Sequence, residues 1–397
     1  MKRIFLSMIL IFLVFVLGAS ISLAEEAVRV GIMNAHSGPM AGPGKMESNA
    51  EMMAVEEYGP VLGKKVEVFT RDNAFQAGLS VEKAKELYEM EKVDVIFGVP
   101  NTAGAIGVSD QAMKNKKLFF STSTTGTDLI ARNRATIKWV YHNYMLPTAI
   151  GTWGGKLGKK FYTITGDYST AKDALKYFSD VLIKKGGELI GNDFVPLGTN
   201  DFSPYILKAK NAKPDVLIII NVAKDTINCT RAVVEYGLKK DVKVLYWFLT
   251  ETDIKEAGVD IFSGGYCAAP WNWTAKIPGA REFADRFNKK YGSRPSYLCA
   301  GGYSAVWQYF EAIKRAGTKE TVAVSKALQN HTFKDFFCNP GYIRGEDNLQ
   351  MGDAFILRVK KPEEIKEGED YYEVIETLPT AMVQPDPNFF GRKLVEF

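Results

Sequence analysis

The feature that most constrains this chain is a repeated alternation of short apolar segments with stretches of helical periodicity. In the first half, the apolar segments lie at residues 28–33, 66–70, 93–98 and 118–120. The pattern restarts at 160–165, and its plainest member, residues 216–220, is an unbroken apolar run. Strands separated by helices of about 10–15 residues form parallel sheets with right-handed crossovers. The sequence therefore predicts an α/β protein with parallel sheets.

The first 24 residues have the composition of a secretory signal peptide. Lys2 and Arg3 precede an apolar run over residues 4–17, and small residues follow as far as Ala24. A run of about 14 apolar residues is shorter than the span of about 20 that a bilayer requires. We therefore expect cleavage after Ala24 and export of the remaining chain to the periplasm.

Composition and spacing exclude several classes of function. The formal charge of +4 falls to +2 when Lys2 and Arg3 leave with the signal peptide, so we expect no nucleic-acid partner. The three histidines are isolated and no CxxC motif occurs, so we expect no metal and no cofactor. Export permits disulfides with three possible connectivities. We expect at least one oxidised pair among Cys229, Cys267, Cys299 and Cys338.

A run of hydroxyl residues follows the apolar segment 118–120 directly. Residues 121–125 are all Ser or Thr, Gly126 follows, and we expect a helix to begin near Asp128. Open α/β sheets bind ligands at the carboxyl ends of their strands, and free N–H groups at a helix start attract a carboxylate. Hydroxyls add further donors. The run indicates either a carboxylate-binding site or a solvated turn that caps a helix.

Several short motifs occur in an order that is specific as a set. They are Ser37-Gly38-Pro39 after the first strand, the strand 93–98, the strand end at 119–125, Gly166-Asp167-Tyr168, and the turn at 291–295. With the preceding signal peptide, this order resembles the periplasmic solute-binding proteins of branched-chain amino acid ABC transporters, the leucine/isoleucine/valine-binding type. The resemblance extends over nearly the whole chain after the signal peptide.

This resemblance implies two Rossmann-like lobes with a ligand cleft between them. Three chain crossings, near residues 141–144, 268–271 and 349–352, would act as hinges for closure. Lobe I would then contain residues 25–143 and 270–350. Lobe II would contain residues 144–269 and 351–397.

The resemblance also implies a set of ligand-binding residues. Positions that hold the ligand's carboxylate in lobe I correspond here to Thr102, Ser123, Thr124 and Thr125. The corresponding positions in lobe II are Asp167, Tyr168 and Asn221, and an acid that holds an ammonium group falls at Glu251 or Asp253. Two aromatic positions of the family are replaced by Pro43 and Val222, and this difference argues against a leucine-like ligand.

We interpret the chain as a monomeric binding protein and not as an enzyme. It would capture a small carboxylate-bearing solute, either an amino acid or an aromatic or other organic acid. It would then deliver the solute to an ABC permease complex in the inner membrane. An exported hydrolase is the alternative from another class, but the sequence has no GxSxG motif. A receptor ligand domain on the same fold is a third possibility.

Overall fold

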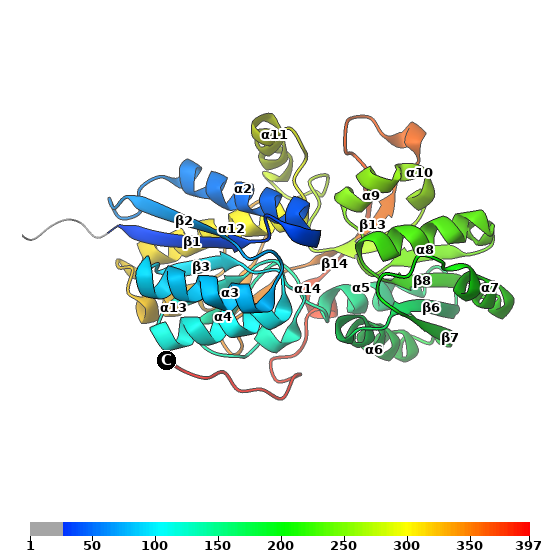
Figure 1. Cartoon of the computed structure of the whole chain (residues 1–397), viewed down its shortest axis with the longest axis horizontal. Helices are drawn as coiled ribbons and strands as arrows, with labels where there is room; N and C mark the ends of the chain where they lie inside the picture. Colours follow the sequence, from blue (N-terminus) through cyan, green and yellow to red (C-terminus); the bar gives the residue numbers. More distant parts are fainter. Residues whose placement is uncertain (1–26) are drawn as a thin grey trace, which may run out of the picture.

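The computed structural model describes residues 27–397, so the predicted signal peptide lies outside the described residues. Two lobes lie side by side, and each is built on one seven-stranded sheet with helices on both faces (Figure 1). The predicted fold class is confirmed. No helix within residues 27–397 is long and apolar enough to cross a membrane.

The sheet of the first lobe has the strand order β11-β12-β5-β4-β3-β1-β2. All neighbouring strands in it are parallel except β11, which pairs antiparallel with β12. The strands are β1 (Val28–Asn34), β2 (Val66–Asp72), β3 (Val95–Gly98), β4 (Leu118–Ser121), β5 (Thr136–Lys138), β11 (Tyr342–Arg344) and β12 (Leu349–Met351). The helices of this lobe are α2 (Ala41–Tyr58), α3 (Ala77–Lys85), α4 (Thr102–Asn115), α11 (Ala280–Tyr291), α12 (Tyr297–Ala316) and α13 (Thr321–Leu328).

Alternate residues of the central strands face two different cores in the first lobe, as the two-residue period of a strand requires. Phe97 of β3 and Phe120 of β4 lie in the core beneath α2 and α12, with their ring centroids 5.0 Å apart. Ile96 and Phe119 face the opposite core, beneath α3 and α4. Burial on both faces explains why these strands are apolar throughout.

The sheet of the second lobe has the order β14-β13-β10-β9-β8-β6-β7. Its first five strands along the chain are parallel, and β13 and β14 add an antiparallel edge. The strands are β6 (Lys160–Gly166), β7 (Glu188–Val195), β8 (Val216–Ile220), β9 (Lys243–Tyr246), β10 (Tyr266–Ala269), β13 (Ala354–Val359) and β14 (Tyr372–Leu378). The helices are α5 (Met145–Gly154), α6 (Ser169–Lys184), α7 (Ser203–Ala212), α8 (Ala223–Glu235), α9 (Glu251–Ala257), α10 (Val259–Phe262) and α14 (Thr380–Val383).

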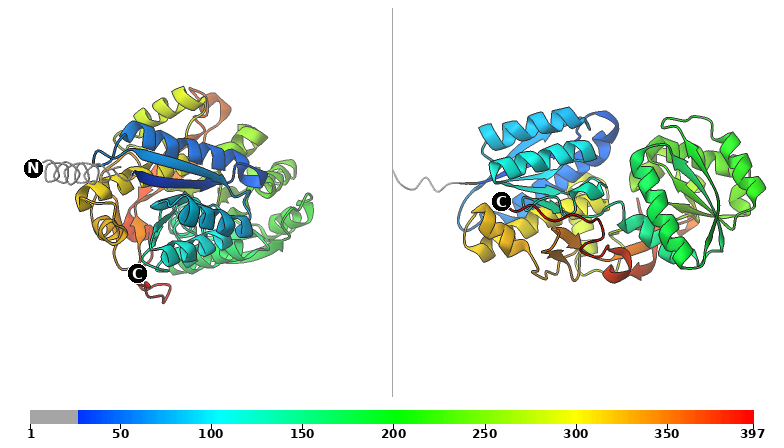
Figure 2. Two further views of the ribbon diagram at one scale, coloured as in Figure 1. Left: turned by 60° about the vertical axis from the view of Figure 1, so that its left-hand side comes forward. Right: turned by 90° about the horizontal axis from the view of Figure 1, so that it is seen from below.

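The chain passes between the two sheets after β5, after β10 and between β12 and β13. A further stretch returns to the first lobe after α14 (Figure 2). There, Arg344 donates to the carbonyl oxygen of Pro385 at 2.7 Å, and Arg134 forms an ion pair with Glu396 at 2.5 Å. The tail thus contacts the first lobe, and Phe389 also packs against Tyr177 of α6 in the second lobe, with ring centroids 6.2 Å apart.

The prediction of a helix that begins near Asp128 is wrong. The structure has only a three-residue 3-10 helix, Thr127–Leu129, followed by an extended residue, Ile130, and then by turns that lead to β5. Leu129 lies in the core beneath α3 and α4, whereas Ile130 packs in a separate small core with Leu349 and Met351. Because the two neighbouring side chains enter different cores, the backbone extends here and does not continue as a helix.

The expectation of an oxidised cysteine pair is also wrong for this structure. Cys229 lies on α8, Cys267 on β10, Cys299 on α12 and Cys338 in the loop before β11. All four are free thiols and all four are buried. They pack as small side chains among the apolar residues of the hydrophobic core.

Candidate ligand-binding site

The loop after β4, residues 122–126, has its carbonyl groups held by the protein. Lys138 donates from Nζ to the carbonyl oxygen of Thr124 at 2.6 Å, and the hydroxyl of Tyr141 donates to that of Ser123 at 3.1 Å. The carbonyl oxygen of Thr125 accepts from the backbone N–H of Asn143 at 2.7 Å. In contrast, no acceptor among the described residues meets the backbone N–H groups of Ser123, Thr124 or Thr125. Consecutive free N–H groups of this kind favour an anion.

The hydroxyl groups of the same loop are mostly engaged within the first lobe. The Thr122 hydroxyl donates to Glu47 Oε1 at 2.5 Å, and the Ser123 hydroxyl donates to Asn34 Oδ1 at 3.3 Å. The Thr124 hydroxyl forms a hydrogen bond with the hydroxyl of Thr102 at 2.6 Å. Thr125 is half-buried, and its hydroxyl has no partner within residues 27–397. The donors that remain open to a ligand are therefore the backbone N–H groups and the Thr125 hydroxyl.

The N-terminal part of α2 crosses directly above the end of β1. A side chain at Gly44 would overlap the carbonyl oxygen of Ala35, so glycine permits this close approach. It brings Glu47 and Glu51, one helical turn apart, into the interior of the lobe, where both are almost fully buried. Burial raises the pKa of Glu51 well above its usual range, and repulsion from Glu47 adds to the rise.

Unpaired polar atoms also follow the ends of three strands in the second lobe. Tyr168 follows β6, Asn221 follows β8, and Trp247 follows β9. The Tyr168 hydroxyl, the Asn221 Oδ1 atom and the Trp247 indole N–H are buried without a hydrogen-bond partner. Buried polar atoms are almost always paired, so a group of unpaired ones at strand ends indicates a place for ligand or water. Asp167, in contrast, is exposed and pairs with Lys172 at 2.5 Å.

The two predicted ammonium ligands, Glu251 and Asp253, both lie in the first turn of α9 but have different partners. Asp253 accepts from the backbone N–H and from the hydroxyl of Thr250, at 2.9 and 2.8 Å, and so closes a capping box at the helix start. Glu251 has no side-chain partner among the described residues. Burial raises the pKa of Glu251 to about 7, and the negative charges of Glu369 and Asp253 add to the rise.

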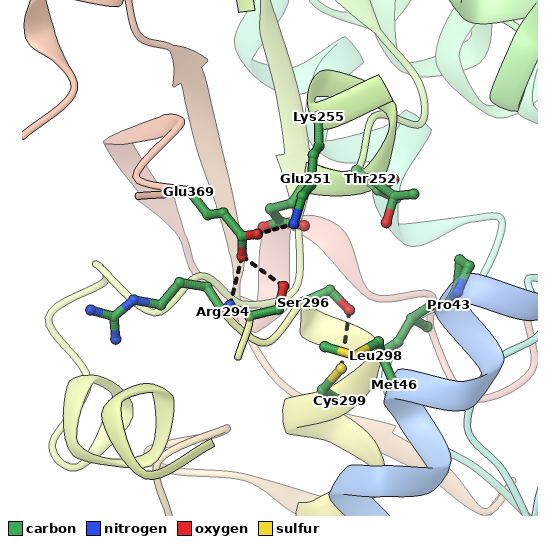
Figure 3. A pocket seen from close by; sticks show the side chains of 12 residues that line it. Pro43, Met46, Glu251, Thr252, Lys255, Arg294, Ser296, Leu298, Cys299 and Glu369 are labelled. Carbon is green, nitrogen blue, oxygen red and sulfur yellow. Dashed lines mark hydrogen bonds and ion pairs between the residues drawn. The ribbon is translucent and has the colours of Figure 1, made fainter. Parts of the chain in front are cut away.

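A pocket lies between the two lobes beside Glu251 (Figure 3). Pro43 and Met46 of α2 lie on one side, and Glu251, Thr252 and Lys255 of α9 lie on the other. Its remaining lining residues are Thr250, Ser293, Arg294, Ser296, Leu298, Cys299 and Glu369. Of the predicted site residues, only Glu251 lines this pocket. Pro43, one of the two differences from the family pattern, lies opposite it.

Glu369 joins the two lobes at the edge of this pocket. It lies in the loop between β13 and β14, and its Oε2 atom accepts from the Ser293 hydroxyl at 2.8 Å and from the Arg294 N–H at 2.6 Å. Its other oxygen pairs with Lys255 at 2.6 Å. Ser293 and Arg294 precede α12 of the first lobe, whereas Lys255 belongs to the second.

Aromatic rings connect the loop after β4 with the pocket. The ring of Tyr141 lies 5.3 Å from that of Tyr297 and 6.4 Å from that of Phe248. Tyr297 begins α12 and Phe248 precedes α9. Cys299 of α12 lines the pocket, and burial raises the pKa of its thiol.

Several of these residues were not predicted from the sequence. Lys138, Glu47 and Glu369 carry no recognisable motif, whereas Arg294 lies in the turn 291–295 but had no predicted part in the site. These residues come from distant segments that only the fold brings together. The role of Asp253 did have a signal, because Thr250 three residues earlier gives the capping-box spacing. No group of three or more residues in the described part of the chain could hold a metal ion.

Residues 27–367 match the family model described as periplasmic binding protein, and the chain belongs to this family. It is 26% identical over 320 residues to "Leu/Ile/Val-binding protein homolog 6" of Brucella melitensis, covering 78% of this chain and 81% of that protein. The structure is also similar to a branched-chain amino acid ABC transporter periplasmic ligand-binding protein of Burkholderia xenovorans. That similarity has a TM-score of 0.85 and 28% identity, over 90% of this chain and 97% of the other.

A further solved structure is a solute-binding protein of an ABC transporter from Rhodopseudomonas palustris in complex with 3,4-dihydroxybenzoic acid. It has a TM-score of 0.81 and 26% identity, over 90% of this chain and 98% of the other. These matches confirm the predicted class, a periplasmic substrate-binding protein of ABC transporters.

Proposed function

We propose that this protein captures a small α-amino acid in the cleft between its lobes. The loop after β4 would hold the carboxylate through the free N–H groups of Thr124 and Thr125. Glu251 would hold the ammonium group when the lobes close. Tyr168, Asn221 and Trp247 would offer their unpaired polar atoms from the second lobe.

The observation that carries this proposal is the unpaired carboxyl group of Glu251 in a pocket with other acids nearby. Glu251 is half-buried. Removing a carboxylate from water without a positive partner is costly, and burial accordingly raises the pKa of Glu251 to about 7. A ligand ammonium would supply the missing positive charge and favour the ionised form of Glu251. An acid without an amino group would leave Glu251 without a positive partner and would be repelled by the ionised form of Glu251.

Calorimetry with L-leucine and its des-amino analogue 4-methylpentanoate tests the proposal, preceded by a thermal-shift screen of amino acids and aromatic acids. Glu251→Gln is expected to weaken amino-acid binding by about 2–4 kcal/mol, since a buried charge pair would lose one partner. Titrations in buffers of different ionisation enthalpy should show proton release near pH 7, because the ammonium lowers the pKa of Glu251. Equal affinity of wild type for an amino acid and its des-amino analogue would exclude the ammonium site.

Two further variants separate binding from stability. Glu256→Gln removes an exposed acid from the same helix and should leave binding unchanged. Asp253→Asn weakens the capping box and should lower the melting temperature without changing the preference for amino over des-amino ligands.

An aromatic acid is the second candidate solute. Phe248 is half-buried between the lobes beside Tyr141 and Tyr297, so a ligand ring could pack in this region. A solute-binding protein of similar structure binds 3,4-dihydroxybenzoic acid. Stronger binding of 4-hydroxybenzoate than of any amino acid in the same screen would favour this candidate.

The partner would be an ABC permease complex, which receives the solute from the closed protein in the periplasm. The protein would act as a monomer and would leave its solute chemically unchanged. Solute recovered intact after incubation with the protein, together with a monomer mass by light scattering, is the expected result.

A further inference from the structure

Lys138 is a fully buried lysine with an unusual set of partners. It is the last residue of β5, opposite Ser121 in the sheet, and none of its surface is exposed. Its Nζ atom forms no ion pair with any described residue. It donates to the carbonyl oxygens of Thr124 at 2.6 Å, Trp139 at 3.2 Å and Ser121 at 3.5 Å. Burying an ammonium group in this way is costly, so its position calls for a reason beyond packing.

The geometry of the peptide bond supplies that reason. In a trans peptide, the C=O of one residue and the N–H of the next point in opposite directions. Lys138 holds the Thr124 carbonyl toward the interior, and Tyr141 does the same for the Ser123 carbonyl. The N–H groups of Thr125 and Thr124 must therefore point away from the interior, toward the strand-end edge where the loop lies.

The positive charge of Lys138 also favours an anion at the loop. The Nζ atom lies behind the loop, so its positive charge adds to the field of the free N–H groups. The acid that faces it is Glu47, whose carboxyl accepts from Thr122 and attracts Lys138. The ring of Tyr141 also faces Nζ, at 5.6 Å from its centroid. Burial lowers the pKa of Lys138 to about 7, and Glu47 opposes that change.

We propose that Lys138 is a positioning residue, which holds the loop after β4 in the form that binds a carboxylate. It does so by fixing the Thr124–Thr125 peptide with its N–H outward. This inference rests on the proposed carboxylate position in the loop, but it does not depend on the ammonium site at Glu251. It assigns to β5 a part in anion recognition without direct contact with the solute.

The test compares Lys138→Met with Lys239→Met. Lys239 is a matched control, since it also donates to two backbone carbonyls, those of Asp260 and Ile261, but lies on the surface of the second lobe. The probes are two acids with their amides, L-leucine with L-leucinamide and 4-hydroxybenzoate with 4-hydroxybenzamide. Lys138→Met is expected to weaken binding of the two acids 10- to 100-fold and binding of the two amides less than threefold. Lys239→Met should change neither, and Lys138→Arg should restore part of the acid affinity.

Crystal structures of wild type and Lys138→Met give a readout that needs no solute. The Thr124–Thr125 peptide should turn or shift in the variant, whereas the rest of the first sheet should stay in place. Equal losses for acid and amide, an unchanged loop, or a wild type that prefers neither acid over its amide would each overturn the proposal. Failure of the ammonium site would appear separately, as equal binding of L-leucine and 4-methylpentanoate.

Discussion

The contacts of Glu369 across the cleft lead to a prediction about closure. Its Oε2 atom accepts from Ser293 and Arg294 of the opposite lobe, and its side chain is only 15% exposed. These two hydrogen bonds exist only while the lobes are together. The pair with Lys255 lies within one lobe and persists when they separate, so its effect on closure largely cancels.

We expect Glu369→Gln to weaken solute binding. A hydrogen bond to a charged group contributes about 1.5–3 kcal/mol, and the neutral amide keeps an acceptor of similar shape. The closed state should therefore lose about 2 kcal/mol, which corresponds to a dissociation constant raised about 30-fold. This holds when the solute-free protein is mostly open, because only then is the energy of closure part of the binding energy.

Isothermal calorimetry with the tightest solute of the thermal-shift screen measures the change, and small-angle scattering measures the fraction of closed protein. Glu376→Gln is the matched control, because Glu376 pairs with Lys156 and Trp153 within the second lobe alone. An unchanged affinity for Glu369→Gln, or an equal loss in both variants, would refute the reasoning.

Three further predictions concern stability and redox state. The raised pKa of Glu251 means that folding favours its protonated form, so its destabilising effect grows as pH rises from 4.5 to about 7. The melting temperature of Glu251→Gln, relative to wild type, should therefore be higher at pH 8 than at pH 4.5. Thiol titration of denatured, unreduced protein should find four free thiols, and two or fewer would contradict the structure. Deleting residues 386–397 should lower the free energy of unfolding by about 1–3 kcal/mol, because Phe397 packs against the first lobe. Urea denaturation measures this loss.

Much of the fold could be predicted from the sequence because strands buried on both faces leave a local signal. The apolar run Val216–Ile220 predicts a buried parallel strand, and all five of its residues are buried. The apolar segment before the hydroxyl run likewise predicts a strand end there, and β4 ends at Ser121. The prediction of a helix after it is wrong, because Ile130 enters a core whose other members, Leu349 and Met351, lie far away in the chain. Periodicity over a few residues carries no information about such distant partners.

Glu251 and Asp253 show how sequence and tertiary structure divide the site between them. The sequence by itself placed both acids just after a strand of the second lobe, and it placed a hydroxyl run after a strand of the first. These are local facts, determined by the order of residues along each strand and its following turn. The tertiary structure decided that Asp253 caps α9, that Glu251 faces the pocket, and that Glu369 reaches Arg294 across it. It also decided which way the loop's peptides point, because Lys138 and Tyr141 reach them from another strand and a crossing. Contacts between segments so far apart in the chain form only when the sheets and lobes pack.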